Sequence, residues 1–164
     1  MIIYITCHGE TEWNKGGILQ GHKDSSLTKK GKLSAKIKGK NLIDKNIQII
    51  YSSDLGRCIN TANIINKYLK IKIIKTPKLR EMDFGDFNGK PDKKFLKEFN
   101  LKNVYKRTPN GENFNDFKKR ILSFIKLLKN KKFEKVLLVT HNGVAKIILN
   151  RSKISKDLIY KIKL

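Results

Sequence analysis

The stretch Ile2-Ile-Tyr-Ile-Thr-Cys-His-Gly-Glu-Thr-Glu-Trp-Asn14 decides how the rest of the chain is interpreted. Its first half is an apolar run, which is typical of a buried strand in an α/β protein. Ligands of such proteins collect where the carboxyl ends of strands give way to loops. His8 stands at that point, before a glycine that ends the run. The stretch therefore predicts a strand that delivers a histidine to a ligand site.

A second copy of this arrangement lies far downstream. The apolar run from Lys135 to Thr140 is followed by His141, Asn142 and Gly143. A single histidine at the end of a strand is most often structural, but two of them favour a shared site. We expect one imidazole to act as a nucleophile and the other to stabilise charge.

Three motifs in chain order identify a family. Cys7-His-Gly-Glu-Thr11 resembles the Arg-His-Gly-Glu-Thr signature of the histidine phosphatase superfamily, the phosphoglycerate mutase-like proteins. Ser52 to Ala62 resembles its Ser-Ser-x-Leu-x-Arg-x-x-x-Thr-Ala motif, and Leu79 to Gly89 its Leu-x-Glu-x-x-x-Gly-x-x-x-Gly element. The resemblance reaches from the first strand to shortly beyond His141. It implies an α/β fold of three layers, α/β/α, with a mostly parallel central sheet in one domain over residues 1–164.

The resemblance also implies roles for individual residues. His8 would be the nucleophile, Arg57 would hold the phosphoryl group, Glu81 would be the proton donor, and His141, which we expect to be protonated, would hold charge. Phosphoryl transfer needs a nucleophile, cationic donors and a proton for the leaving oxygen, and these four residues supply them. The candidate substrate- and phosphate-binding residues are Cys7, Gly9, Asn14, Gln20, Arg57 and Asn142.

Cys7 departs from the family pattern. The family has an arginine there, and a thiol is a weak, neutral donor that cannot clamp a phosphoryl group. Natural drift, an engineered change and a reduced or lost activity all fit this difference. Cys7 itself is a poor candidate nucleophile, because the Cys-x5-Arg loop of cysteine phosphatases would need an arginine where this chain has Trp13.

Three functions agree with these residues. We favour a phosphomonoesterase that acts on a small phosphorylated substrate through a phosphohistidine intermediate. A phosphoglycerate mutase of the same fold and a phosphate-binding pseudoenzyme are the alternatives. We expect no cofactor and no metal, because the expected carboxylate clusters are not visible in the sequence.

The composition is strongly basic. Lys and Arg number 37 against 14 Asp and Glu, which gives a formal net charge of +23 at pH 7. This charge favours anionic partners. The lysines are scattered through every segment, and no basic run is interleaved with stacking aromatics, which argues against a nucleic-acid partner. The only cysteines, Cys7 and Cys58, do not form a metal-binding pattern, and no run approaches a membrane-spanning length, so we expect a cytoplasmic protein without membrane contact. The oligomeric state stays open.

Periodicity predicts the elements of the fold. The strands expected after the first are 47–51, 71–74 and 136–140. Helices are expected from Thr28, from the turn after Ser53, from Glu112 and over about 144–149. Thr28 should cap the first of these helices, and Asp54 or Ser53 the second.

The remaining expectations concern loops and packing. A stripe of small residues (Gly31, Ala35 and Gly39) should let the first helix lie close against the sheet. His22 is expected in an exposed loop, and Glu112 near the pocket. A short lid is expected over about 85–112, irregular between Lys90 and Asn110. We expect the C-terminus to be shortened, without a further strand.

Overall fold

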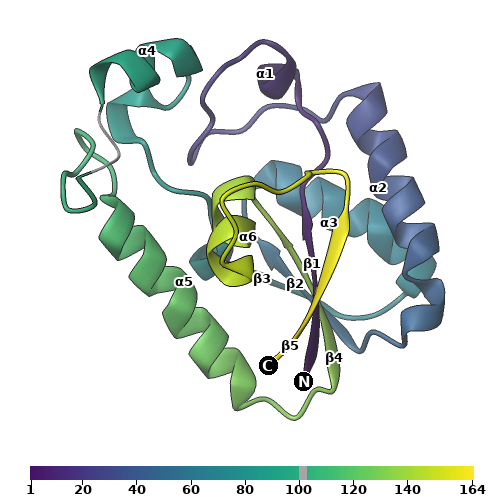
Figure 1. Cartoon of the computed structure of the whole chain (residues 1–164). Helices are drawn as coiled ribbons and strands as arrows, with labels where there is room; N and C mark the ends of the chain where they lie inside the picture. Colours follow the sequence, from purple (N-terminus) through teal and green to yellow (C-terminus); the bar gives the residue numbers. More distant parts are fainter. Residues whose placement is uncertain (100–102) are drawn as a thin grey trace.

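The structure is a computed structural model that describes residues 1–99 and 103–164. Its centre is one five-stranded sheet with the strand order β3-β2-β4-β1-β5 (Figure 1). Strands β1 to β4 pair in parallel, and β5 joins β1 antiparallel. The strands are β1 (Ile2–Cys7), β2 (Ile49–Ser53), β3 (Ile73–Thr76), β4 (Lys135–Thr140) and β5 (Ile159–Lys163).

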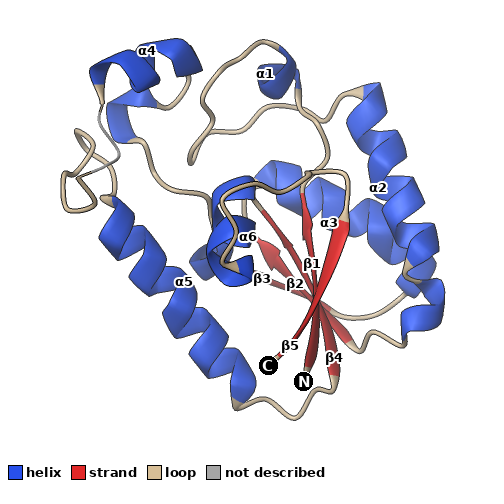
Figure 2. Ribbon diagram, in the orientation of Figure 1, coloured by secondary structure: helices blue, strands red, loops and turns tan. Residues whose placement is uncertain are grey.

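Helices cover both faces of this sheet (Figure 2). On one face, α2 and α3 pack over a core that includes Tyr4, Ile50 and Leu137. On the other, α5 and α6 pack over Ile5 and Leu138. The α-helices in the described residues are α1 (Glu12–Lys15), α2 (Lys29–Asn41), α3 (Gly56–Leu69), α4 (Asp92–Glu98), α5 (Phe114–Lys129) and α6 (Asn142–Leu149).

The predicted fold class is confirmed. The expected strands and long helices all form, with β2 and β3 ending two residues later than predicted. The apolar face of α5 is buried at Phe117, Ile121 and Phe124, because apolar residues three and four apart share one side of a helix.

Helix α2 begins as predicted but packs differently. The Thr28 side chain accepts a hydrogen bond from the Gly31 amide, which confirms the cap. The stripe of small residues does not lie only against the sheet. A Cβ at Gly31 would lie 2.1 Å from the Glu10 carbonyl oxygen, and one at Gly39 would lie 2.4 Å from the Tyr68 ring. The stripe therefore brings α2 close to α3 and to the loop after β1.

The cap of α3 was predicted wrongly. Neither Asp54 nor Ser53 caps the first turn; Asp24, from a distant loop, accepts hydrogen bonds from the amides of Gly56 (2.6 Å) and Arg57 (3.2 Å). Asp54 instead pairs with the guanidinium of Arg80. Sequence proximity suggested the wrong acceptor because the tertiary fold supplied a nearer carboxylate.

Among the elements that were not predicted, β5 and α4 bear on expectations made from the sequence. Residues 159–163 form β5, so the expectation that no strand follows the last helix is wrong. Helix α4 forms within the stretch expected to be irregular, and its Phe95 packs on Phe87 and Phe99. Residues 100–102 of the expected lid lie outside the described residues, and the lid itself stays a prediction. Within the described ranges, no helix is long and apolar enough to cross a membrane.

Candidate active site

A cavity of about 460 Å³ opens where β1 and β4 end. Parallel pairing sets Cys7 beside Thr140, so the residues that follow each strand, His8 and His141, meet at one edge of the sheet. The cavity also takes residues from the loop after α1, from α3, from the segment after β3 and from α6. Its polar lining residues are His8, Asn14, Gln20, Arg57, Glu81, Asp92, His141, Asn142, Lys146 and Lys156.

His8 is held in one tautomer. Its Nδ1 lies 2.8 Å from the Gly9 carbonyl oxygen, which can only accept, so Nδ1 carries the ring proton. Burial, and then the positive charge of Arg57, lower the pKa of His8 from 6.5 to about 3. The imidazole is therefore neutral at pH 7, and Nε2 keeps its lone pair. This is the state that a nucleophile needs.

His141 lies beside His8, with the ring centroids 5.2 Å apart. Its Nε2 is 2.9 Å from the Ser53 hydroxyl oxygen, and its side chain is fully buried. Burial and the nearby Arg57 and His8 hold the pKa of His141 well below its usual 6.5. The expectation that His141 is protonated is therefore wrong for this structure, because its surroundings disfavour a second positive charge.

Arg57 is the buried cation of the site. It is 2 % exposed, and its Nη1 and Nη2 donate to the carbonyls of Lys23 and Gly21 and to the Asp24 carboxylate, at 2.7 to 2.8 Å. These bonds fix the guanidinium against the loop after α1. Placed in the first turn of α3, it stands where helix N-termini favour anions.

Glu81 enters the cavity from the segment after β3. Its two carboxylate oxygens accept hydrogen bonds from the amides of Met82 and Gly143, both at 3.0 Å. A Cβ at Gly143 would lie 2.3 Å from the Glu81 carboxylate, so only glycine leaves room for this contact. The start of α6 thereby positions the carboxylate.

Three buried polar atoms in the described chain have no hydrogen-bond partner: Gln20 Oε1, Arg57 Nε and Asn142 Oδ1. All three belong to residues that line this one cavity. Buried polar groups are almost always satisfied, so unpartnered ones that converge on a cavity indicate a polar ligand. The Arg57 Nε–H is a donor and suits an anion. The side-chain amides of Gln20 and Asn142 can exchange the positions of O and NH₂ by a flip, and each could then donate to an anion as well.

The cavity brings together seven of the nine residues named from the sequence and leaves out two. His8, Arg57, Glu81, His141, Asn14, Gln20 and Asn142 line it, as expected. Cys7 and Gly9 do not. Cys7 is 1 % exposed and packs in the apolar core with Val144 and Ala145, so the expectation that its side chain reaches a bound phosphoryl group is wrong. Burial raises the pKa of its thiol to about 12, which opposes thiolate chemistry.

Several supporting residues were missed or misplaced. His22 is half-buried rather than exposed, and its Nε2 lies 3.0 Å from the Glu81 carbonyl oxygen. Glu112 does not line the cavity; its carboxylate pairs with Arg120, whose guanidinium donates to the carbonyls of Arg80 and Glu81. Arg120 could not be found from sequence because its helical position is typical of a solvated arginine.

Lys146 and Lys156 were also missed as lining residues. Each is one lysine among many in the chain, so composition gave no signal for either. In the part of the chain that the structure describes, no group of three or more His, Cys, Asp or Glu side chains could hold a metal ion.

Comparison with known proteins points to one family. A sequence model described as "Histidine phosphatase superfamily (branch 1)" matches residues 3–162. A Hydrogenobacter thermophilus protein with the provisional name phosphoserine phosphatase 2 is 32% identical over 154 residues, covering 90% of this chain and 76% of that protein. A phosphoglycerate mutase of Schizosaccharomyces pombe is 31% identical, covering 99% and 85%.

A solved structure shows the same fold. The crystal structure of the alpha-ribazole phosphatase from Shigella flexneri superposes with a TM-score of 0.87. It covers 100% of this chain and 91% of its own, at 24% identity. At this identity the likeness speaks for the fold alone.

Proposed function

Because the chain belongs to the histidine phosphatase superfamily (branch 1), we propose that it hydrolyses phosphate monoesters of small molecules through a phosphohistidine at His8. The observation that carries this proposal is the tautomer of His8. The Gly9 carbonyl accepts a hydrogen bond from Nδ1–H, so the lone pair of Nε2 is available in a cavity that also holds Arg57 and Glu81. A volume of about 460 Å³ suits a small substrate.

In the first step, His8 Nε2 attacks phosphorus while the bond from phosphorus to the ester oxygen breaks. The leaving oxygen keeps the electron pair and takes a proton from Glu81. Arg57 stabilises the charge on the equatorial oxygens, and neutral His141 donates a hydrogen bond rather than a full charge. The Nδ1 bond to Gly9 stabilises the positive charge that His8 gains.

In the second step, water attacks the phosphohistidine. Glu81, now a carboxylate, takes a proton from the water, and the bond from phosphorus to nitrogen breaks. His8 recovers its lone pair and inorganic phosphate leaves. None of these steps needs a metal ion, so we propose that turnover is metal-independent.

The test is to trap the intermediate with a ³²P-labelled aryl phosphate. We expect an acid-labile, base-stable label that is absent in His8→Ala and present in Glu81→Ala. Cys7→Ala is the matched control and should keep the label. A label that follows Cys7, or activity that chelator abolishes and a divalent ion restores, would contradict the proposal.

Product analysis separates the alternatives. A phosphatase releases inorganic phosphate, whereas a phosphoglycerate mutase returns the phosphoryl group to a second position of its substrate. A phosphate-binding pseudoenzyme would bind orthovanadate without either product. We expect inorganic phosphate from an aryl phosphate and no isomerised phosphoglycerate.

A further inference from the structure

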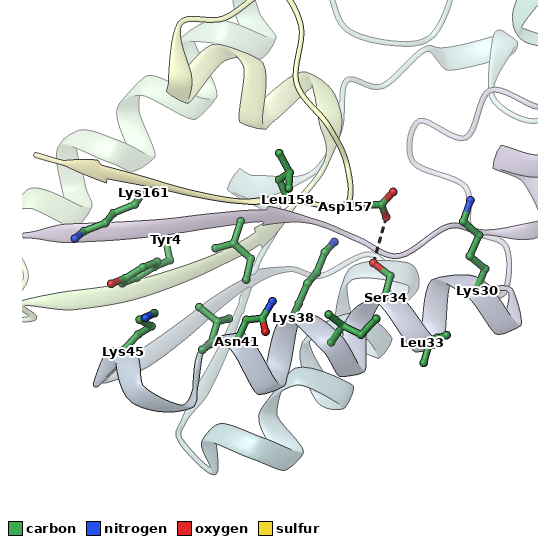
Figure 3. A pocket seen from close by; sticks show the side chains of 13 residues that line it. Tyr4, Lys30, Leu33, Ser34, Lys38, Asn41, Lys45, Asp157, Leu158 and Lys161 are labelled. Carbon is green, nitrogen blue, oxygen red and sulfur yellow. Dashed lines mark hydrogen bonds between the residues drawn. The ribbon is translucent and has the colours of Figure 1, made fainter.

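The segment from Lys156 to Leu158, just before β5, is fastened to the rest of the fold at three consecutive residues. Lys38 Nζ donates to the Lys156 carbonyl at 2.8 Å. Ser34 Oγ donates to the Asp157 carboxylate at 3.2 Å (Figure 3). Thr6 Oγ1 donates to the Leu158 carbonyl at 3.2 Å. Side chains of α2 and β1 thus fix the path of this segment.

Lys38 is the unusual member of this set. It is 2 % exposed and extends from α2 toward the strands (Figure 3), and its Nζ also donates to the Cys7 carbonyl at 3.1 Å. Burial lowers the pKa of its amine, because an ammonium loses hydration there. Because the Lys38 ammonium donates to the carbonyls of both Cys7 and Lys156, it holds these two residues next to each other.

The consequence is the location of Lys156. In the antiparallel register, Thr6 lies opposite Ile159, so the turn that precedes Ile159 passes the end of β1, where His8 follows Cys7. Lys38 fixes the backbone of Lys156. Lys156 is itself exposed and lines the same cavity as His8. Its positive charge contributes to the lowered pKa of His8 and opposes the raised pKa of Cys7.

The phosphoryl-binding set is incomplete without a further cation. Arg57 uses three of its five N–H donors on the loop after α1, so it offers a ligand only its Nε proton and the second Nη2 proton. His141 is neutral, and Cys7 is buried away from the cavity. A transferring phosphoryl group spreads charge over three equatorial oxygens, which the two remaining donors of Arg57 do not cover alone.

We infer that Lys156 is a phosphoryl-binding residue of this site and that Lys38 is the positioning residue that holds it beside His8. The role of Lys156 in catalysis rests on the proposed function, whereas its role in binding a phosphate group does not. The ligand class is a phosphate group, either of the substrate or as the free product.

The first experiment removes Lys156 and, as a control, a lysine that does not line the cavity. Lys156→Met should lower kcat/KM for an aryl phosphate about tenfold to a hundredfold and weaken binding of orthovanadate, because a donor to the transition state is lost. Lys156→Arg should restore most of both. Lys153→Met removes the same charge from an exposed position that does not line the cavity, and it should change both by less than about threefold. Equal losses of kcat/KM and of orthovanadate binding in the two methionine variants would mean that the lysines act only through their general positive charge, and would overturn the inference.

The second experiment tests Lys38 with a double-mutant cycle. Lys38→Met keeps the volume and removes the donors, and it should lower kcat/KM with a rise in KM. Adding Lys156→Met to it should then cost little more, because the cation is already misplaced. Fully additive losses would overturn the positioning role. If Lys38→Met does not fold, the same cycle with Ser34→Ala, which frees Asp157, decides the question.

Vanadate calorimetry keeps the two proposals apart. A wild type that turns over, with Lys156→Met unchanged in both assays, contradicts the role of Lys156 and leaves the function standing. A wild type that binds vanadate without turnover contradicts the function, whereas weaker binding by Lys156→Met still supports the lysine. A wild type that does neither overturns both.

Discussion

Gly143 is the residue at which the proposed general acid meets the start of α6. Its amide donates to Glu81, and the missing side chain leaves the carboxylate its place. Gly143→Ala should stay folded, because the end of a glutamate side chain can move, but it should lower kcat about tenfold to a hundredfold through misplacement of the proton donor. Orthovanadate affinity should change by less than about threefold.

Gly16→Ala is the matched control for this change. A Cβ there meets its nearest neighbour at 3.5 Å, which is ordinary contact, and the residue has no left-handed backbone. Thermal unfolding should be similar in both variants. A Gly143→Ala protein with the kcat of the wild type would show that the contact to Glu81 is not needed for proton transfer.

Among single residues, sequence motifs located the proposed reacting residues but not their protonation states. His8, Arg57, Glu81 and His141 follow strands or open helices in recognisable patterns, so their convergence was predictable. The neutral form of His141 was not, because it depends on complete burial beside another cation. The inward direction of Cys7 depends on which face of β1 meets α6, and that is a tertiary property.

Among the elements, Asp24 connects the loop after α1 to helix α3. It caps the first turn of α3 and pairs with the Arg57 side chain at 2.8 Å, although it is itself 35% exposed. Asp24→Ala should lower the free energy of unfolding by about 2–3 kcal/mol, because it removes a cap and leaves a buried guanidinium partly unpaired. Vanadate binding should weaken as Arg57 loses its orientation.

Asp44→Ala provides the comparison, since Asp44 is an exposed acid in a short helical turn. It should change the free energy of unfolding by less than about 0.5 kcal/mol. Urea unfolding monitored by circular dichroism measures both variants. Equal stability of the two would show that Asp24 is dispensable for holding α3 and Arg57.

The long elements were predictable and the short ones were not. Helix α5 and strand β4 carry enough apolar residues at the right spacing to be recognised alone. Strand β5 alternates lysines with half-buried apolar residues, a pattern that a polar loop can also have. Its pairing with β1 is what makes it a strand. The four residues of α1 are too few for periodicity to register.

The molecule as a whole should lose stability in acid through its two site histidines. The folded chain holds His8 neutral down to a pKa of about 3, whereas the unfolded chain protonates it near 6.5. Between these values the unfolded state binds the extra proton, so stability is fully present above about pH 6.5 and falls as the pH drops. The expected slope is about 1.4 kcal/mol per pH unit for each such histidine.

Urea unfolding between pH 7 and pH 4.5 measures this slope. His141 acts in the same direction, because its pKa is also lowered. His8→Asn should flatten the dependence by about one proton, and a second change, His141→Asn, should flatten it further. If His8→Asn and the wild type share one slope, His8 is not buried as a neutral group.

Strand β1 lies between β4 and β5, and this placement sets the order in which the protein can be completed. Ile2 pairs with Lys135 on one side and with Lys163 on the other, so both neighbours of the strand that precedes His8 come from the last third of the sequence. During vectorial synthesis β1 leaves the ribosome before either partner exists. A nascent chain arrested before Lys135 can pair β2 with β3, but it holds β1 without a hydrogen-bonded strand on either side. Strand β1 is therefore translated before the other four strands of the sheet but is among the last to be built into it.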